Sequence, residues 1–247
     1  MSVEEAKEFV KGVNGWLTDR EGEFLYQAAR SCAGPPTGGV IVEIGSLKGK
    51  STIWLASGSK AGNKIPVYAV DHHQGSPEHY RWYGPAPINT LPEFQKNIKA
   101  AEMADIVIPI VKTSAVAAQN FNLPVELIFI DGDHDYQSVK QDFELWFPKL
   151  IEGGTIVFHD TGGWAPWIGP IILMFKHIYP SRQLKDMQIV DSMTVAVKTG
   201  RVSFLDIIKK FSKIPEWFLN TITMAATLTN LKKLLTKLFV PKSLLRL

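Results

Sequence analysis

Short apolar, β-branched runs alternate along this 247-residue chain with stretches of helical periodicity, and this alternation restricts the fold most strongly. The runs expected to form strands are Val40–Ile44, Pro66–Val70, Ile106–Val111, Val125–Ile130 and Thr155–His159. The helical stretches between them lie near Lys50–Ser59, Leu91–Met103 and Tyr136–Phe147. Strands separated by helices pair in parallel, and the helices then cover both faces of the sheet. The sequence therefore predicts an α/β fold built on a mainly parallel sheet.

Two further strand-like runs follow Lys185, at Met187–Val190 and Thr194–Lys198, and only three residues separate them. A parallel crossover needs a dozen or more residues, so these two runs are expected to form a hairpin. The sheet should therefore include an antiparallel strand near its C-terminal end.

Composition limits the class of protein. Cys32 is the single cysteine, which excludes an intrachain disulfide and disfavours a cysteine-based zinc site. The polar, acidic start MSVEEAKEFVKG lacks the charged-then-apolar order of a signal peptide. We therefore expect a cytoplasmic protein.

Charge is spread unevenly along the chain. Residues 201–247 contain nine Lys or Arg and two acidic residues, which leaves 18 basic and 22 acidic groups before them. The net charges are +7 and −4, so no nucleic-acid partner is expected for the main part. We predict a domain over residues 1–200 and a basic, amphipathic helical extension over 201–247. The extension is either a peripheral membrane contact or a helix pair packed on the body or on another subunit of a homo-oligomer.

The segment IVEIGSLKGKST follows the first expected strand and opens a helix. Gly45 and Gly49 enclose three residues, one fewer than a phosphate-binding P-loop needs. Leu47 stands where a dinucleotide fingerprint needs its second glycine. An acid-x-Gly-x-x-x-Gly loop remains, formed by Glu43, Gly45 and Gly49. Such a loop brings the backbone close to a nucleoside, and Asp71, at the end of VYAVD, is placed to reach its ribose hydroxyls.

Two long irregular stretches, His72–Thr90 and Thr161–Gly169, follow the carboxyl ends of strands, where ligands bind in open α/β sheets. The first contains Tyr80, Trp82 and Tyr83 and is interpreted as an aromatic lid.

With these motifs the chain resembles class I S-adenosylmethionine-dependent methyltransferases. It is most similar to the subgroup of cephalosporin-hydroxylase-type and macrolide sugar O-methyltransferases. The resemblance covers roughly residues 15–198 and rests on five motifs: GWLTDREGEFLYQAAR, VEIGSLKGKST, VYAVD, FIDGDHDYQSVKQDFELWFPKL and GGTIVFHD. It implies a Rossmann-like sheet of seven strands with a C-terminal antiparallel strand.

The resemblance also implies a cofactor and its site. S-adenosylmethionine would be bound by residues from four strand ends: Glu43, Gly45, Ser46, Gly49, Ser51, Asp71, Ser114 and Asp131. The family pattern further places a metal-binding acid at Asp131, a general base at His134, and an acidic pair at His159 and Asp160. His159 departs from that pattern, which leaves the identity of the metal open between magnesium and manganese. A metal ligand and a supporting or substrate contact are both compatible with His159.

Methyl transfer to a hydroxyl group explains this set of residues. The sulfonium methyl group is already activated, so the enzyme positions the acceptor and removes its proton. A divalent cation lowers the pKa of a bound hydroxyl, and a histidine base then works near neutral pH. The structural alternative is a polar loop, in which Asp135 caps the next helix and His134 only stabilises the turn. Two other functions stay open: transfer to nitrogen or carbon, and a non-catalytic relative that binds a nucleoside.

Overall fold

The computed structural model describes residues 1–36, 38–77, 80, 84, 86–162, 168–219 and 221. Within them one sheet is formed by the strands β1 (Val40–Ile44), β2 (Val67–Val70), β3 (Val107–Ile110), β4 (Val125–Ile130), β5 (Leu150–Phe158), β6 (Leu184–Val190) and β7 (Met193–Lys198). Their spatial order is β3-β2-β1-β4-β5-β7-β6. Strands β1 to β5 are parallel, and β7 is antiparallel to both of its neighbours. The predicted fold class is confirmed.

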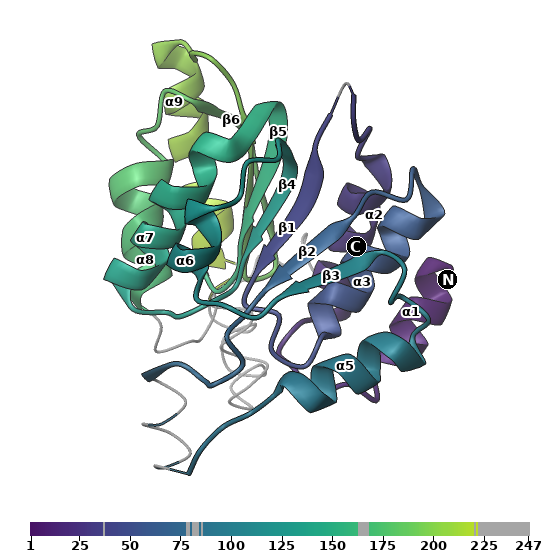
Figure 1. The fold of residues 1–247 in the computed structure, drawn as a ribbon. Coiled ribbons are helices and arrows are strands. Elements are labelled where there is room, and N and C mark those ends of the chain that lie inside the picture. The colour runs from purple at the N-terminus through teal and green to yellow at the C-terminus, as the bar shows by residue number, and fades with distance from the viewer. Residues whose placement is uncertain are drawn as a thin grey trace, which may run out of the picture.

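Helices cover both faces of this sheet (Figure 1). One face carries α1 (Val3–Val10), α2 (Asp19–Ser31), α3 (Lys50–Ala61) and α5 (Leu91–Ala100). The other carries α6 (Ser114–Gln119), α7 (Tyr136–Trp146), α8 (Ile168–Leu173) and the π-helical turn η2 (Met174–Ile178). The strands are therefore apolar on both faces, as in Ile41 and Leu127 toward the first layer and Val42 and Ile128 toward the second.

Local signals fix the ends of several helices. Asp135 caps α7, because its carboxylate accepts the backbone N–H of Gln137 at 2.9 Å. Pro148 ends that helix, and the short 3₁₀ turn η1 (Phe147–Lys149) leads into β5. Strand β5 begins at Leu150, before the expected Thr155, because Gly153 with φ +81° lets an irregular first half join the strand.

The expected hairpin near the C-terminal end is present as β6 and β7. Its turn is Asp191–Ser192, and Asp191 adopts a left-handed φ of +50°. The antiparallel strand β7 does not lie at the edge of the sheet. It is inserted between β5 and β6, so β6 becomes the edge strand.

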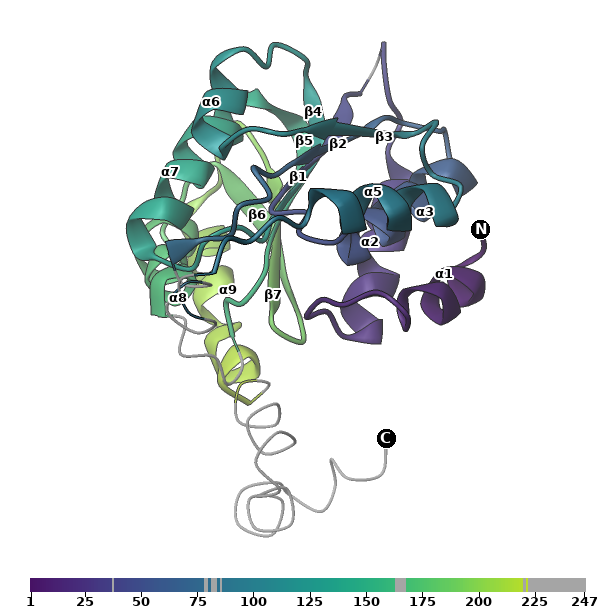
Figure 2. The same cartoon turned by 60° about the horizontal axis from the view of Figure 1, so that its bottom comes forward.

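The described start of the predicted C-terminal extension packs against the body. Helix α9 (Phe204–Phe211) lies near β6, and the chain after it continues downward in the view of Figure 2. The ammonium group of Lys210 is buried and donates to the backbone carbonyl of Ser181, and the Phe211 ring lies 5.6 Å from that of Tyr179. The rest of the predicted extension, residues 222–247, falls outside the described residues. Among the described helices, none has the length and apolar character needed to cross a membrane.

Candidate active site

From β1 the chain adds strands β2 and β3 on one side, and from β4 it adds strands on the other side. The loops after β1 and β4 therefore face one another. The backbone of Gly45 has a φ of +89°, and its N–H donates to the carbonyl of Val70. A Cβ on this residue would lie 2.1 Å from the carbonyl oxygen of Asp131. Only glycine fits here, so the first loop and the β4 end approach closely at the switch point, where ligands bind in such sheets.

Asp71, at the end of β2, holds the first loop in place. One carboxylate oxygen accepts the backbone N–H of Leu47 at 2.8 Å, and the other accepts that of His73 at 2.7 Å. Leu47 itself adopts a left-handed φ of +46°. The acid therefore shapes the loop directly and lies beside any ligand that the loop binds.

A large cavity of about 1120 Å³ opens at this end of the sheet. Nine of the residues predicted for the site line it: Gly45, Ser46, Ser51, Asp71, Ser114, Asp131, His134, His159 and Asp160. The structure thus brings together residues that are spread over more than a hundred positions of sequence.

The other two predicted cofactor residues, Glu43 and Gly49, lie behind the cavity wall. Glu43 is fully buried, and its carboxyl accepts the Thr52 hydroxyl at 2.5 Å, which connects β1 to α3. Burial raises the pKa of Glu43 to about 8 despite hydrogen bonds from Ser51 and Thr52. Gly49, with φ +90°, is the residue from which α3 starts. Both residues support the loop from behind.

Ser114, at the start of α6, is engaged with two buried partners. Its hydroxyl accepts the indole N–H of Trp146 at 2.8 Å. It also bonds to Asp142, a residue of α7 that sequence reasoning did not single out. Burial raises the pKa of Asp142 to about 6, even though the Ser114 hydroxyl lowers it. Ser114 and Asp142 therefore form one polar wall of the cavity.

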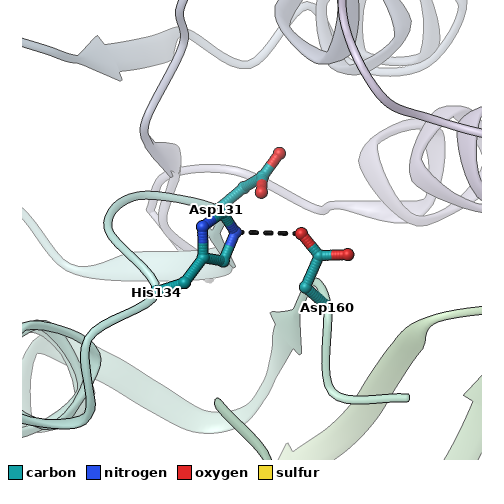
Figure 3. A group of neighbouring side chains, drawn as sticks. All are labelled: Asp131, His134 and Asp160. Atoms are coloured by element: carbon teal, nitrogen blue, oxygen red, sulfur yellow. Dashed lines mark ion pairs between the residues drawn. The ribbon is translucent and has the colours of Figure 1, made fainter. Parts of the chain in front are cut away.

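Three potential metal ligands meet where β4 and β5 end (Figure 3). Asp131, His134 and Asp160 each offer one ligand atom, and these atoms all lie within 4.8 Å of one another. The imidazole Nε2 of His134 lies 2.9 Å from an Asp160 carboxylate oxygen. Asp160 adopts a left-handed φ of +52°, a conformation that aspartate adopts more readily than most residues other than glycine.

His159 lies deeper, behind the two carboxylates. Its Nδ1 is 3.1 Å from Asp131 and 3.3 Å from Asp160, and its Nε2 is 3.5 Å from Glu21 of helix α2. Within the part of the chain that the structure describes, the group of atoms close enough to share a metal does not include His159. Its assignment as a metal ligand therefore stays a prediction.

The charges of this cluster depend on one another. Burial lowers the pKa of His159, but the surrounding Asp131 and Asp160 outweigh burial and raise it well above its usual range. Burial would likewise raise the pKa of Asp160, but the charge of His159 and the contact with His134 hold it well below its ordinary value. For Asp131 burial prevails over His159, and the pKa is raised.

Sequence reasoning missed Glu21 and Ser192, which complete this cluster. Glu21 is buried, and one of its oxygens accepts both the backbone N–H and the hydroxyl of Ser192, at 2.8 and 2.6 Å. The motif Thr18-x-x-Glu21 is the pattern of a capping box, so the local role of Glu21 was readable. Its contact with His159, 138 positions away, was not.

The rim of the cavity joins distant segments. Gly162 lines the cavity, and the Trp217 indole lies against it from the segment after α9. From the predicted aromatic lid, Gly75 and Ser76 also line the cavity, and Tyr80 of the same segment donates its hydroxyl to the carbonyl of Gln74. The lid residues Trp82 and Tyr83 fall outside the described residues.

Comparison with known proteins places this site in context. Residues 42–161, from β1 to the end of the Asp160 loop, match a family described as a methyltransferase domain. An uncharacterized protein of Acanthamoeba polyphaga mimivirus, R132, is 30% identical over 135 residues, which cover 53% of this chain and 56% of that protein. This chain spans 14% to 56% of the length of the curated relatives that it matches.

Solved structures share the fold at low sequence identity. The O-methyltransferase TomG of Streptomyces achromogenes, solved in complex with S-adenosylmethionine, is similar with a TM-score of 0.56 and 15% identity over 80% of this chain and 89% of TomG. An O-methyltransferase of Bacillus cereus, solved with S-adenosylhomocysteine, gives a TM-score of 0.52 and 22% identity over 79% and 90%.

Proposed function

We propose that this chain is a class I methyltransferase that transfers the methyl group of S-adenosylmethionine to a hydroxyl oxygen of a small molecule. One observation carries the proposal. The glycine loop with Asp71 and the cluster of Asp131, His134 and Asp160 line the same cavity. A nucleoside site and a group of proton-accepting and metal-binding side chains therefore face the same space.

The cofactor half of the cavity lies along the ends of β1, β2 and β3. Gly45 gives close access to the backbone, Asp71 offers carboxylate oxygens, and Ser114 borders the opposite side. Most pockets for one small ligand measure about 300–1,000 Å³. A cavity of about 1120 Å³ therefore has room for the cofactor and an acceptor together.

The acceptor half lies at the ends of β4 and β5. Two carboxylates and one imidazole within 4.8 Å of one another suit a divalent cation, so the residues present fit a metal. Asp131 and Asp160 would hold it with their carboxylate oxygens. When bound, such a cation lowers the pKa of a hydroxyl group that it contacts.

His134 acts as the general base that removes the proton of the acceptor hydroxyl. In the transfer a carbon–oxygen bond forms, the carbon–sulfur bond breaks, and the hydroxyl proton passes to the His134 imidazole. The Asp160 carboxylate, 2.9 Å from Nε2, stabilises the imidazolium ion that results. A hydroxyl group loses its proton far less readily than an ammonium ion does, so a hydroxyl acceptor has the greater need of a general base. The presence of the His134–Asp160 pair therefore favours oxygen as the methyl acceptor.

Turnover of methyl-labelled cofactor with a panel of alcohols, phenols, sugars and amines tests this function. We expect label to appear on oxygen, and to disappear with Asp160→Asn. Label on nitrogen or carbon would favour the alternative acceptors. Cofactor binding without transfer to any acceptor would indicate a non-catalytic relative.

A further inference from the structure

Glu21 belongs to the capping box of α2, and its carboxylate also contacts His159 and Ser192, far away in the sequence. Its Oε2 accepts the backbone N–H of Thr18 at 2.8 Å and faces Nε2 of His159, while its Oε1 accepts two hydrogen bonds from Ser192. The carboxylate is 1% exposed. It therefore joins the start of α2, the end of β5 and the β6–β7 turn at one point.

Helix α1 has a capping box too, and within the described part of the chain the acid there has only its capping contacts. In α1, Glu5 accepts the backbone N–H of Ser2 at 2.7 Å, as Glu21 does for Thr18. Glu5 lies in the exposed first turn and has no partner of the His159 kind among the described contacts. Burial of Glu21 costs solvation, so its extra contacts must offset that cost. Capping by itself does not account for the position of Glu21.

His159 lies between Glu21 and the two carboxylates at the cavity surface, Asp131 and Asp160. Both ring nitrogens face carboxylate oxygens, Nε2 toward Glu21 and Nδ1 toward Asp131 and Asp160. The ring is 5% exposed, and Phe129 lies edge-on to it at 6.0 Å. The ring therefore lies between Glu21 on one side and Asp131 and Asp160 on the other.

We propose that Glu21 and His159 act as a pair of positioning residues that holds Asp131 and Asp160 close together on the cavity side. Two carboxylates at such a distance repel each other unless a cation or a donor lies between them. The imidazole of His159 approaches both from behind, with Nδ1 3.1 and 3.3 Å from their oxygens, and both carboxylates still line the cavity. The proposal rests on the proposed function where it assigns those faces to a metal.

This pair also gives His159 a role other than metal ligand. A ligand nitrogen needs a lone pair directed at the metal, and each nitrogen of His159 already lies within 3.5 Å of a carboxylate oxygen. The protein atoms at the ion would then be carboxylate oxygens with the His134 ring nearby. Side chains that orient metal ligands in this way typically change metal affinity about 10–100-fold when they are replaced.

Glu21→Gln is the decisive variant, because an amide keeps the shape and an oxygen for Ser192 but removes the charge opposite Nε2. Two controls match it. Glu5→Gln alters the same capping motif away from the site. Glu126→Gln alters an acid that accepts the backbone N–H groups of Ala33, Gly34 and Gly39 and lies at the start of β4, the opposite end of that strand from Asp131.

Manganese binding to the full-length variants, followed by electron paramagnetic resonance, is the first measurement. We expect Glu21→Gln to weaken binding at least about tenfold, and both controls to stay within about twofold of the wild type. Affinity for S-adenosylhomocysteine should be the same in all four proteins. Equal manganese affinity in Glu21→Gln and wild type, or an equal loss in Glu126→Gln, would overturn the proposal.

Crystal structures of the wild type and Glu21→Gln separate this inference from the proposed function. We expect the variant to show the His159 ring turned away from Asp131 and a wider separation of Asp131 and Asp160. An unchanged ring and unchanged carboxylates would refute the positioning role whatever the metal does. A wild type that binds no manganese would count against the metal alone, and the two structures would still decide the role of Glu21.

Discussion

The indole N–H of Trp217 donates a hydrogen bond to the backbone carbonyl of Thr161 at 2.5 Å, across 56 positions of sequence. Thr161 follows Asp160 directly, and the Phe175 ring packs edge-on against the Trp217 ring at 5.7 Å. The segment after α9 therefore supports the loop that carries part of the site. The predicted boundary at residue 200 cuts through this support.

Two truncated chains should behave differently for this reason. A chain that ends at Thr221 keeps the contact, and we expect affinity for S-adenosylhomocysteine within about twofold of the full chain. A chain that ends at Gly200 loses Trp217, Phe211 and the buried Lys210, and should bind about tenfold more weakly and unfold at lower temperature. Calorimetry and thermal unfolding measure both effects. Equal affinity of the two truncated chains would show that the extension is separate from the site.

The same two chains test the expected surface role of the basic extension. Its residues 222–247 hold five Lys or Arg and no acid. If this part binds an anionic membrane, sedimentation with acidic vesicles should be lost in both truncated chains and weakened by salt. If it instead contacts another subunit, the truncations should lower the oligomeric mass in light scattering and leave vesicle binding unchanged.

Asp71→Ala should weaken binding of S-adenosylmethionine and S-adenosylhomocysteine about tenfold or more. The variant removes an acceptor beside the ligand and also releases the N–H groups of Leu47 and His73 that shape the loop. Asp105→Ala, which removes an exposed acid paired with Lys60, serves as the control. Tighter binding of NAD than of either nucleoside would contradict this account of the loop.

His134→Ala should lower turnover about 10²–10⁴-fold while cofactor affinity stays nearly constant, because a general base acts only on the acceptor proton. Exhaustive chelation should also stop transfer. Magnesium should then restore it, since Asp131 and Asp160 offer the oxygen ligands that magnesium prefers. Manganese as the only effective ion would instead indicate an imidazole ligand. Full activity after chelation would remove the metal from the mechanism.

Glu43 should make stability depend on pH. Its pKa is about 8 in the folded chain and 4.5 ordinarily, so between these values the folded state keeps a proton that the unfolded state releases. The free energy of unfolding should therefore fall as pH rises from about 4.5 to about 8, by up to about 1.4 kcal/mol per pH unit. Glu43→Gln should remove this contribution. Urea unfolding of both proteins across this range gives the difference, and parallel curves would contradict the expectation.

Much of the fold was predictable because it depends on local pattern. The runs at Val40–Ile44 and Val125–Ile130 form strands with the expected bounds, since both faces of a central strand are apolar. Helix α6 (Ser114–Gln119) was not expected, because six residues show too little periodicity. The insertion of β7 between β5 and β6 was also missed, since a short turn predicts a hairpin but does not determine which of its strands meets the sheet.

The site was predictable where motifs lie at strand ends and not where it depends on tertiary contact. Gly45, Asp71, Asp131 and Asp160 follow strands that the topology brings to one edge. The roles of Glu21 and His159 depend on a contact between α2 and the end of β5, which no spacing in the sequence encodes. The placement of Glu43 behind the wall likewise follows from packing of β1 against α3.

Because β7 lies between β5 and β6, the sheet of the nascent chain cannot be completed in the order of the sequence. The five parallel strands are synthesised by Phe158, but the outer edge of β5 pairs only with β7, which ends at Lys198. Strand β6 emerges earlier and cannot cover that edge, because its sheet partner is also β7. Until β7 has left the ribosome, the outer edge of β5 and the edge of β6 that pairs with β7 therefore stay open, and open edges of this kind pair with other chains and aggregate. Pairing of β7 (Met193–Lys198) closes both of these edges at once.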